Sequence, residues 1–95
     1  MIHAVVLIEC DIDEIPDAAR AMADLEGISE VYSVTGEFDL VAIVRVSRHE
    51  DLAEVIPGGV ARVPGVVRTQ TLIAFQVFSA YDLERLFSIG FEDAE

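Results

Sequence analysis

The 95-residue sequence is poor in cysteine, in basic residues and in long apolar runs. Its single cysteine, Cys10, excludes an internal disulfide framework and a cysteine-based zinc site, and a lone thiol is typical of a reducing cytoplasm. No apolar run approaches the roughly 20 residues that a transmembrane helix needs. The N-terminus shows neither the basic stretch nor the cleavage site of a signal peptide. We therefore expect a cytoplasmic protein with no membrane partner.

Positive charge is scarce, because six arginines and no lysine stand against 18 acidic residues, for a net charge of −12. The arginines form no cluster, so nothing matches the positive footprint of a DNA- or RNA-binding surface, and we expect no direct nucleic-acid partner. His3 and His49 are isolated, and no nucleophile–base order, phosphate-binding loop or metal-ligand spacing is present. We expect no catalytic residue, no metal and no cofactor, and hence no enzyme.

Hydrophobic residues are abundant and make up 53% of the sequence. A domain of this length buries only about 60–65% of the surface that its unfolded chain exposes, so it gains stability from a partner. We predict one domain over residues 1–95 and expect part of its hydrophobic surface to be buried between subunits.

Runs of β-branched and other apolar residues predict four strands, over Ile2–Ile8, Val31–Thr35, Leu40–Val46 and Val67–Val77. A short loop that contains Gly36 separates the second run from the third, which is typical of a β-hairpin. In Leu40–Val46 both sets of alternate residues are largely apolar, which predicts a central strand covered on both faces.

Helical spacing of apolar residues predicts a first helix over Ile15–Leu25. Pro16 suits a first helical position, and Gly27 suits a C-cap. A second run with helical spacing predicts a short helix over Ser79–Ile89, which docks on the body or on a neighbour. Glu92–Glu95 is expected to fray.

A capping-box pattern, Ser47-Arg48-His49-Glu50, predicts the start of another helix from about Glu50 to Ile56. Pro57-Gly58-Gly59 interrupts this helix, because proline removes a helical hydrogen bond and glycine adds flexibility. We expect a kink there, followed by one more turn that reaches Arg62.

The resulting order β-α-β-β-α-β predicts an α+β fold of the ferredoxin-like type. In this fold a four-stranded antiparallel sheet carries both helices on one face, and here a short C-terminal helix follows. The other face is bare in a monomer. Because it is apolar, sheet-to-sheet dimerisation is the simplest way to bury it.

Two segments resemble a known family: Val31–Leu40, with Val-Thr-Gly-Glu-Phe-Asp at its centre, and Val63–Thr71, with Pro-Gly-Val-Val-Arg-Thr-Gln-Thr. They resemble the effector-binding domain, or RAM domain, of the Lrp/AsnC (feast/famine) transcription regulators. The resemblance extends over residues 2–78. It implies dimers that associate further, often into an octameric ring. It also implies an amino-acid effector, bound between dimers near the hairpin loop and the Thr-x-Thr strand.

Two features depart from this family pattern. Full-length members carry an N-terminal helix-turn-helix domain, whereas here the sheet domain begins at the second residue. The resemblance therefore implies a stand-alone domain that modulates full-length Lrp/AsnC-type regulators by co-assembly or serves another partner as a sensor. The second departure, Pro57-Gly58-Gly59, leaves the shape of the second helix open.

The predicted ligand-binding residues lie on the hairpin loop and the last strand: Val34, Thr35, Gly36, Glu37, Phe38, Asp39, Thr69 and Thr71. Asp39 either binds the ammonium group of an amino acid or caps the turn. Phe38 either covers the site or anchors a neighbouring subunit, and Glu37 is either solvated or in contact with the ligand.

The remaining candidates also have two interpretations each. Thr69 and Thr71 share one strand face, where their hydroxyls either bind the ligand or only favour the strand. Gly36 is expected to adopt a positive φ in the turn, with or without lining the pocket. Backbone N–H groups of the loop can hold a ligand carboxylate.

The alternative function is a dimeric α+β barrel enzyme of the cofactor-free monooxygenase type, which encloses a pocket inside the dimer. His3, Tyr32 or His49 would then serve chemistry. A third possibility is an assembly module whose ligand site is vestigial. The position of the pocket separates the first two.

Overall fold

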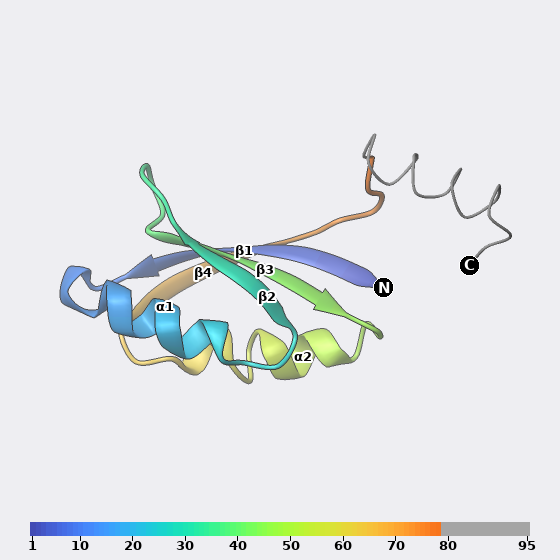
Figure 1. Ribbon diagram of the computed structural model, residues 1–95, viewed down its shortest axis with the longest axis horizontal. Helices are drawn as coiled ribbons and strands as arrows, with labels where there is room; N and C mark the ends of the chain where they lie inside the picture. The colour runs from blue at the N-terminus through green and yellow to red at the C-terminus, as the bar shows by residue number, and fades with distance from the viewer. Residues whose placement is uncertain (79–95) are drawn as a thin grey trace, which may run out of the picture.

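The computed structural model describes residues 1–78, which form a four-stranded antiparallel sheet with two helices on one face (Figure 1). The elements are β1 (Ile2–Cys10), α1 (Ile15–Ala23), β2 (Ile28–Ser33), β3 (Leu40–Val46), α2 (Asp51–Val55) and β4 (Val66–Ile73), with single 3₁₀ turns η1 (Ile12–Glu14) and η2 (Val60–Arg62). The strand order β2-β3-β1-β4 confirms the predicted ferredoxin-like fold. The helix expected over 79–89 and the frayed end expected over 92–95 lie outside the described residues.

The core lies between the sheet and the helices. Because side chains alternate across a strand, every second residue of β1 and β3 points to the helices. These residues are buried: Ala4, Val6, Ile8, Cys10, Leu40, Ala42, Val44 and Val46. They pack against Ala18 and Met22 of α1 and against Leu52, Val55, Ile56 and Val60 of the second helical segment. Each large side chain contributes about 1.5–3 kcal/mol when fully buried.

Strand lengths differ from the sequence prediction because pairing partners set them. β2 begins at Ile28 instead of Val31, where the chain leaves the turn after α1 and pairs with Val44. β4 ends at Ile73 instead of Val77, where its pairing with β1 stops. Ile73 pairs with Ala4, and the following N–H, from Ala74, donates the last bond to β1.

The ends of the helices also differ from the sequence prediction. α1 ends at Ala23 with Asp24 as its C-cap, so Gly27 is not the cap. Instead Gly27 has φ of 97° and turns the chain into β2. A Cβ atom at this position would lie 2.8 Å from Cγ2 of Val55 and 3.1 Å from Cγ1 of Val46. The turn is therefore pressed against both α2 and β3.

The predicted capping box of Ser47 and Glu50 does not form. The backbone N–H of Arg48 donates to Oδ2 of Asp51 at 3.2 Å, and the Arg48 guanidinium donates to Oδ1 at 3.1 Å. Asp51 thus takes the role expected of Glu50, one residue later, and α2 starts there.

The predicted kink is confirmed: α2 stops at Val55, and the single turn η2 reaches Arg62. Gly59 allows this path, because a Cβ atom there would lie 2.6 Å from the carbonyl oxygen of Val55. The chain therefore doubles back directly against the end of α2. Within residues 1–78, no helix is long and apolar enough to cross a membrane.

The face of the sheet turned away from the helices has no covering element among the described residues (Figure 1). We call it the open face. Its apolar residues are Val5, Leu7, Val41, Ile43 and Leu72, which the strand registers place side by side. Leu72 remains 50% exposed. β3 was expected to be covered on both faces. Within the described chain the helices cover one face, and no element covers the other (Figure 1).

The close contact at Gly27 predicts an unequal cost of two glycine substitutions. Gly27→Ala and Gly36→Ala both place a side chain at a positive φ, which costs about 1–3 kcal/mol each. Only Gly27→Ala also meets Val55, whereas nothing lies within 4 Å at Gly36. Overpacking adds about 1–3 kcal/mol to the first variant. Urea unfolding measures the difference, and equal losses would contradict this packing.

Candidate functional site

The hairpin loop between β2 and β3 lies at the end of the sheet where β1 finishes (Figure 1). Its first four residues, Val34, Thr35, Gly36 and Glu37, are exposed, and Phe38 and Asp39 are half-buried. Gly36 has φ of 124°, which confirms the predicted positive value. The exposed part of the loop can therefore present its backbone N–H groups and the Glu37 carboxylate to a ligand.

Asp39 holds the base of this loop on β1. Its backbone N–H donates to the carbonyl of Ile8 at 2.9 Å, and its carboxylate Oδ2 accepts the backbone N–H of Cys10 at 2.9 Å. Its carbonyl accepts the N–H of Val34 at 3.0 Å, which closes the hairpin. The Asp39 side chain therefore bonds to β1 and not to the backbone of its own turn, and its role as a ligand contact stays a prediction. Among residues 1–78, its Oδ1 atom accepts no hydrogen bond and can face a ligand.

The thiol next to Asp39 is not poised for chemistry. Cys10 is buried, and this burial, with the nearby carboxylates of Asp39 and Asp11, raises the pKa of the thiol above its ordinary value. Since the thiolate is the nucleophile, a raised pKa makes Cys10 less reactive. Cys10 therefore packs as a core residue.

A contact that the sequence did not predict ties the loop to β4. The Phe38 ring lies under the Arg68 guanidinium, with 4.8 Å from Cζ to the ring centroid. Arg68 Nε donates to Oε1 of Glu9 at 3.0 Å, in a pair whose side chains are 50% and 41% exposed. Glu9 and Arg68 face each other in the β1–β4 register. The two segments of family resemblance therefore meet across the end of β1.

Sequence analysis missed Glu9 and Arg68 for different reasons. Glu9 lies beyond the first predicted strand, Ile2–Ile8, but β1 continues to Cys10. Arg68 and Thr69 are adjacent in β4 and therefore point to opposite faces of the sheet. The prediction took Thr69 and Thr71 as the ligand contacts and so concerned the face opposite Arg68. The available signal was the antiparallel pairing of strands 1 and 4, which places opposite charges on one face.

Thr69 and Thr71 lie on the helix side of the sheet. In the register they face Ile8 and Val6, whose side chains are buried under the helices. The prediction that the two threonines share a face is confirmed. Thr69 is half-buried and Thr71 is exposed, and no side-chain hydrogen bond in the described chain joins either to the hairpin loop. Within one chain, β1 separates them from the loop.

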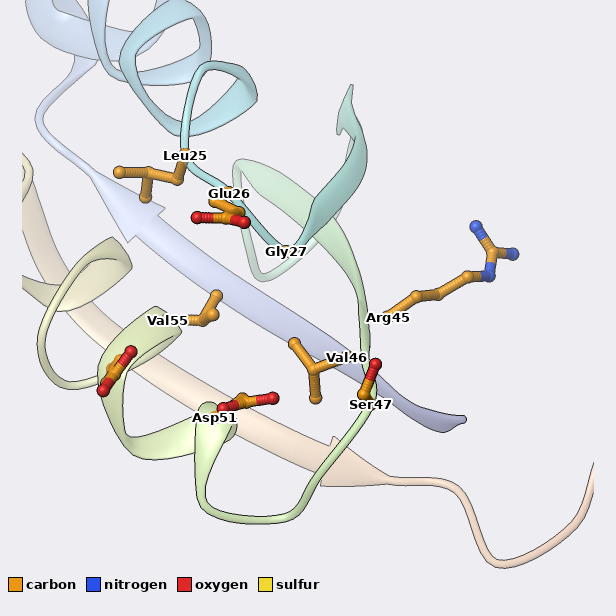
Figure 2. Close-up of a pocket in the computed structure, with 9 residues that line it drawn as sticks. Leu25, Glu26, Gly27, Arg45, Val46, Ser47, Asp51 and Val55 are labelled. Atoms are coloured by element: carbon orange, nitrogen blue, oxygen red, sulfur yellow. The ribbon is translucent and has the colours of Figure 1, made fainter.

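A hollow of about 440 Å³ lies at the opposite end of β3, between the turn after α1 and the start of α2 (Figure 2). Its lining consists of Leu25, Glu26, Gly27, Arg45, Val46, Ser47, Asp51, Glu54 and Val55. The Arg45 side chain points away from the others in Figure 2. None of the predicted ligand-binding residues lines this hollow, and neither do the alternative candidates His3, Tyr32 and His49.

The histidines do not form a metal centre with their neighbours. His3 is half-buried on β1 opposite Arg45, and His49 is exposed before α2. Within residues 1–78, no three or more histidine, cysteine or acidic side chains are grouped closely enough to hold a metal ion.

Comparison with known proteins shows a consistent set of relatives. The family model for the Lrp/AsnC ligand binding domain matches residues 3–82. A crystal structure from Thermus thermophilus has a TM-score of 0.80 and 43% identity, over 83% of this chain and 99% of that chain. The feast or famine regulatory protein of Mycobacterium tuberculosis, complexed with L-methionine, has a TM-score of 0.70 and 27% identity, over 84% and 54% of the two chains.

An uncharacterised HTH-type transcriptional regulator of Pyrococcus horikoshii is 32% identical over 59 residues. The aligned part is 62% of this chain but 39% of the relative, so the chain spans well under half the length of that regulator. The likeness therefore concerns one domain of the regulator. Because the family match extends over residues 3–82 of 95, and because the βαββαβ sheet agrees with it, the chain belongs to the Lrp/AsnC family through its ligand-binding domain.

Proposed function

We propose that the chain is an amino-acid-binding and oligomerisation domain whose ligand-linked assembly modulates Lrp/AsnC-type transcription factors. In this proposal it is a single cytoplasmic domain and not an enzyme. The observation that carries the proposal is the open face, an apolar surface of the sheet that borders the hairpin loop. The M. tuberculosis relative complexed with L-methionine supports an amino acid as the ligand class.

The open face suits a second copy of the chain because it is both apolar and electrically balanced. Five aliphatic residues form its centre. Its charged residues are two acids, Glu9 and Glu30, and two arginines, Arg45 and Arg68, which the registers place on this side. These charges cancel, so the net charge of −12 resides on the rest of the molecule. Two copies can therefore approach at this face with little repulsion.

Ligand binding and assembly are coupled in this proposal because they use the same elements. β1 supplies the centre of the open face and, at Ile8 and Cys10, the bonds that hold Asp39. A ligand at the hairpin loop contacts a segment that lies at the rim of the subunit contact. If it binds one assembly more tightly than another, it shifts the equilibrium by that difference in affinity.

The enzyme alternative finds little support in the groups that it would need. His3, Tyr32 and His49, which would serve the chemistry, do not line the hollow between α1, β3 and α2. A hydrogen bond to the Glu30 carboxylate, with its negative charge, raises the pKa of Tyr32. This interaction favours the neutral phenol and makes Tyr32 a weaker candidate for a general base. The matched Pyrococcus horikoshii relative is a transcriptional regulator.

Disruption of the open face predicts loss of assembly. Ile43→Glu places a charge at the centre of this face, where burial without a partner is costly. Ala53→Glu adds the same charge on an exposed position of α2 and is the matched control. In sedimentation velocity the wild type and Ala53→Glu are expected to form dimers or larger species. Ile43→Glu is expected at the monomer mass of 10.4 kDa. A wild-type monomer, or an unchanged Ile43→Glu assembly, contradicts the proposal.

Amino-acid binding predicts a selective gain in thermal stability. A ligand at 100 times its dissociation constant adds about 2.7 kcal/mol. In a domain of this size that raises the melting temperature by on the order of ten degrees. A thermal-shift panel of the L-amino acids measures this gain, and a flat response across the panel would rule out an amino-acid sensor.

The same panel can test Asp39 if the variant preserves the fold. Asp39→Ala removes the acceptor for the Cys10 N–H, so it lowers stability regardless of any ligand. Asp39→Asn keeps an oxygen acceptor and removes only the charge. We expect it to fold and to lose most of the ligand-induced shift. An undiminished shift in Asp39→Asn would show that another group binds the ammonium.

Co-assembly with a full-length relative is the regulatory part of the proposal. Since the contact uses the open face, a tagged full-length Lrp/AsnC-type regulator from the same cell should retain the wild-type chain after co-expression. The Ile43→Glu variant should be lost from the same pull-down. If the wild-type chain never mixes with such a regulator, it acts on a different partner.

A further inference from the structure

The Arg68 guanidinium is held on one edge and one face. Its Nε atom donates to Glu9 at 3.0 Å, and the Phe38 ring covers the guanidinium plane at 4.8 Å from Cζ. Within residues 1–78, neither of its terminal nitrogens, Nη1 and Nη2, donates a hydrogen bond. The two N–H groups that can bind a carboxylate side by side are therefore available.

Two other arginines of the described chain, Arg20 and Arg48, are used differently. Arg20 donates through Nη1 to Asp17 at 3.3 Å, and Arg48 donates through Nη2 to Asp51 at 3.1 Å. Both pairs join residues three apart in the sequence and stay local. Arg68 instead joins residues 59 apart and leaves its terminal nitrogens unused by the described residues. The contacts with Glu9 and Phe38 thus orient the guanidinium and leave Nη1 and Nη2 available to a ligand.

The position of Arg68 suits a ligand at the hairpin loop. It contacts Phe38, whose sequence neighbours Glu37 and Asp39 provide two carboxylates. It lies on the edge strand β4, at the loop end of the open face, and its side chain is half exposed. An amino acid carries a cation and an anion close together. The loop supplies carboxylates for the ammonium group, and Arg68 supplies a guanidinium for the carboxylate.

We propose that Arg68 binds the α-carboxylate of the amino acid through Nη1 and Nη2, with Glu9 and Phe38 as its positioning residues. This inference rests on the proposed amino-acid site. A guanidinium matches a carboxylate with two parallel hydrogen bonds, which a lysine cannot reproduce. Because the group is already oriented, little freedom is lost when the ligand binds.

Selectivity for the free carboxylate follows from this assignment. In a chain with a net charge of −12, an anionic group needs a local positive partner. An amino-acid amide keeps the ammonium but replaces the carboxylate with a neutral group, so it loses the charge-assisted bonds. The site should therefore bind L-amino acids and discriminate against their α-carboxamides.

The experiment uses the full chain and a panel of L-amino acids, each beside its α-carboxamide, with thermal shift followed by calorimetric titration of the pairs that respond. The wild type is expected to bind the acid at least tenfold more tightly than the amide. Arg68→Gln should bind both equally, and Arg68→Lys should keep only part of the preference. Arg20→Gln is the matched control, since it removes an exposed arginine of α1 that lies away from both the loop and the open face.

Each outcome decides between the two proposals. Equal binding of acid and amide by the wild type overturns the role of Arg68 and leaves the amino-acid site intact. If Arg68→Gln still binds the acid more tightly than the amide, the role of Arg68 is also overturned. The carboxylate is then assigned to the backbone N–H groups of the loop. A flat panel overturns both proposals. The acid–amide comparison in the wild type needs no variant, so it decides the question even if Arg68→Gln does not fold.

Discussion

The pairing of β1 with β3 and β4 is the interaction on which the rest of the structure depends. One set of alternate β1 residues forms the centre of the core, and the other set forms the centre of the open face. The last residues of β1 hold both segments of the candidate site. The backbone of Ile8 and Cys10 fixes Asp39, and Glu9 fixes Arg68. A single strand thus joins the core, the proposed subunit contact and the proposed ligand site.

This arrangement gives a physical basis for the proposed coupling between ligand binding and assembly. The hairpin loop projects from the sheet, but its base is fixed by backbone bonds and by the contact between Phe38 and Arg68. The loop tip is exposed and free to contact a ligand or a neighbouring subunit. The threonines of β4 face the helix side, and β1 separates them from the loop of the same chain. A site that includes both the loop and Thr71 would therefore take its residues from two subunits. Binding across such a contact would couple ligand to assembly.

The sequence predicted what depends on local patterns. The alternation of apolar residues defined the strands, Gly36 indicated the turn, and Pro57 indicated the kink after α2. Features that depend on distant partners were wrong or missed. β4 ends at Ile73, where its pairing with β1 stops, and no local pattern in Val67–Val77 marks that end. The contact of Phe38 with Arg68 joins residues that only the sheet brings together. Thr69 and Thr71 remain predictions as ligand contacts.

The central claim is that ligand and assembly are linked, and sedimentation equilibrium with and without ligand tests it most directly. The association constants of the full chain would be measured over a range of protein concentrations, with and without a saturating amino acid that binds. The account predicts that the ligand changes the association constant between subunits by the ratio of its affinities for the two assemblies. Superimposable association curves at saturating ligand would contradict it, because a ligand with equal affinity for both assemblies shifts nothing.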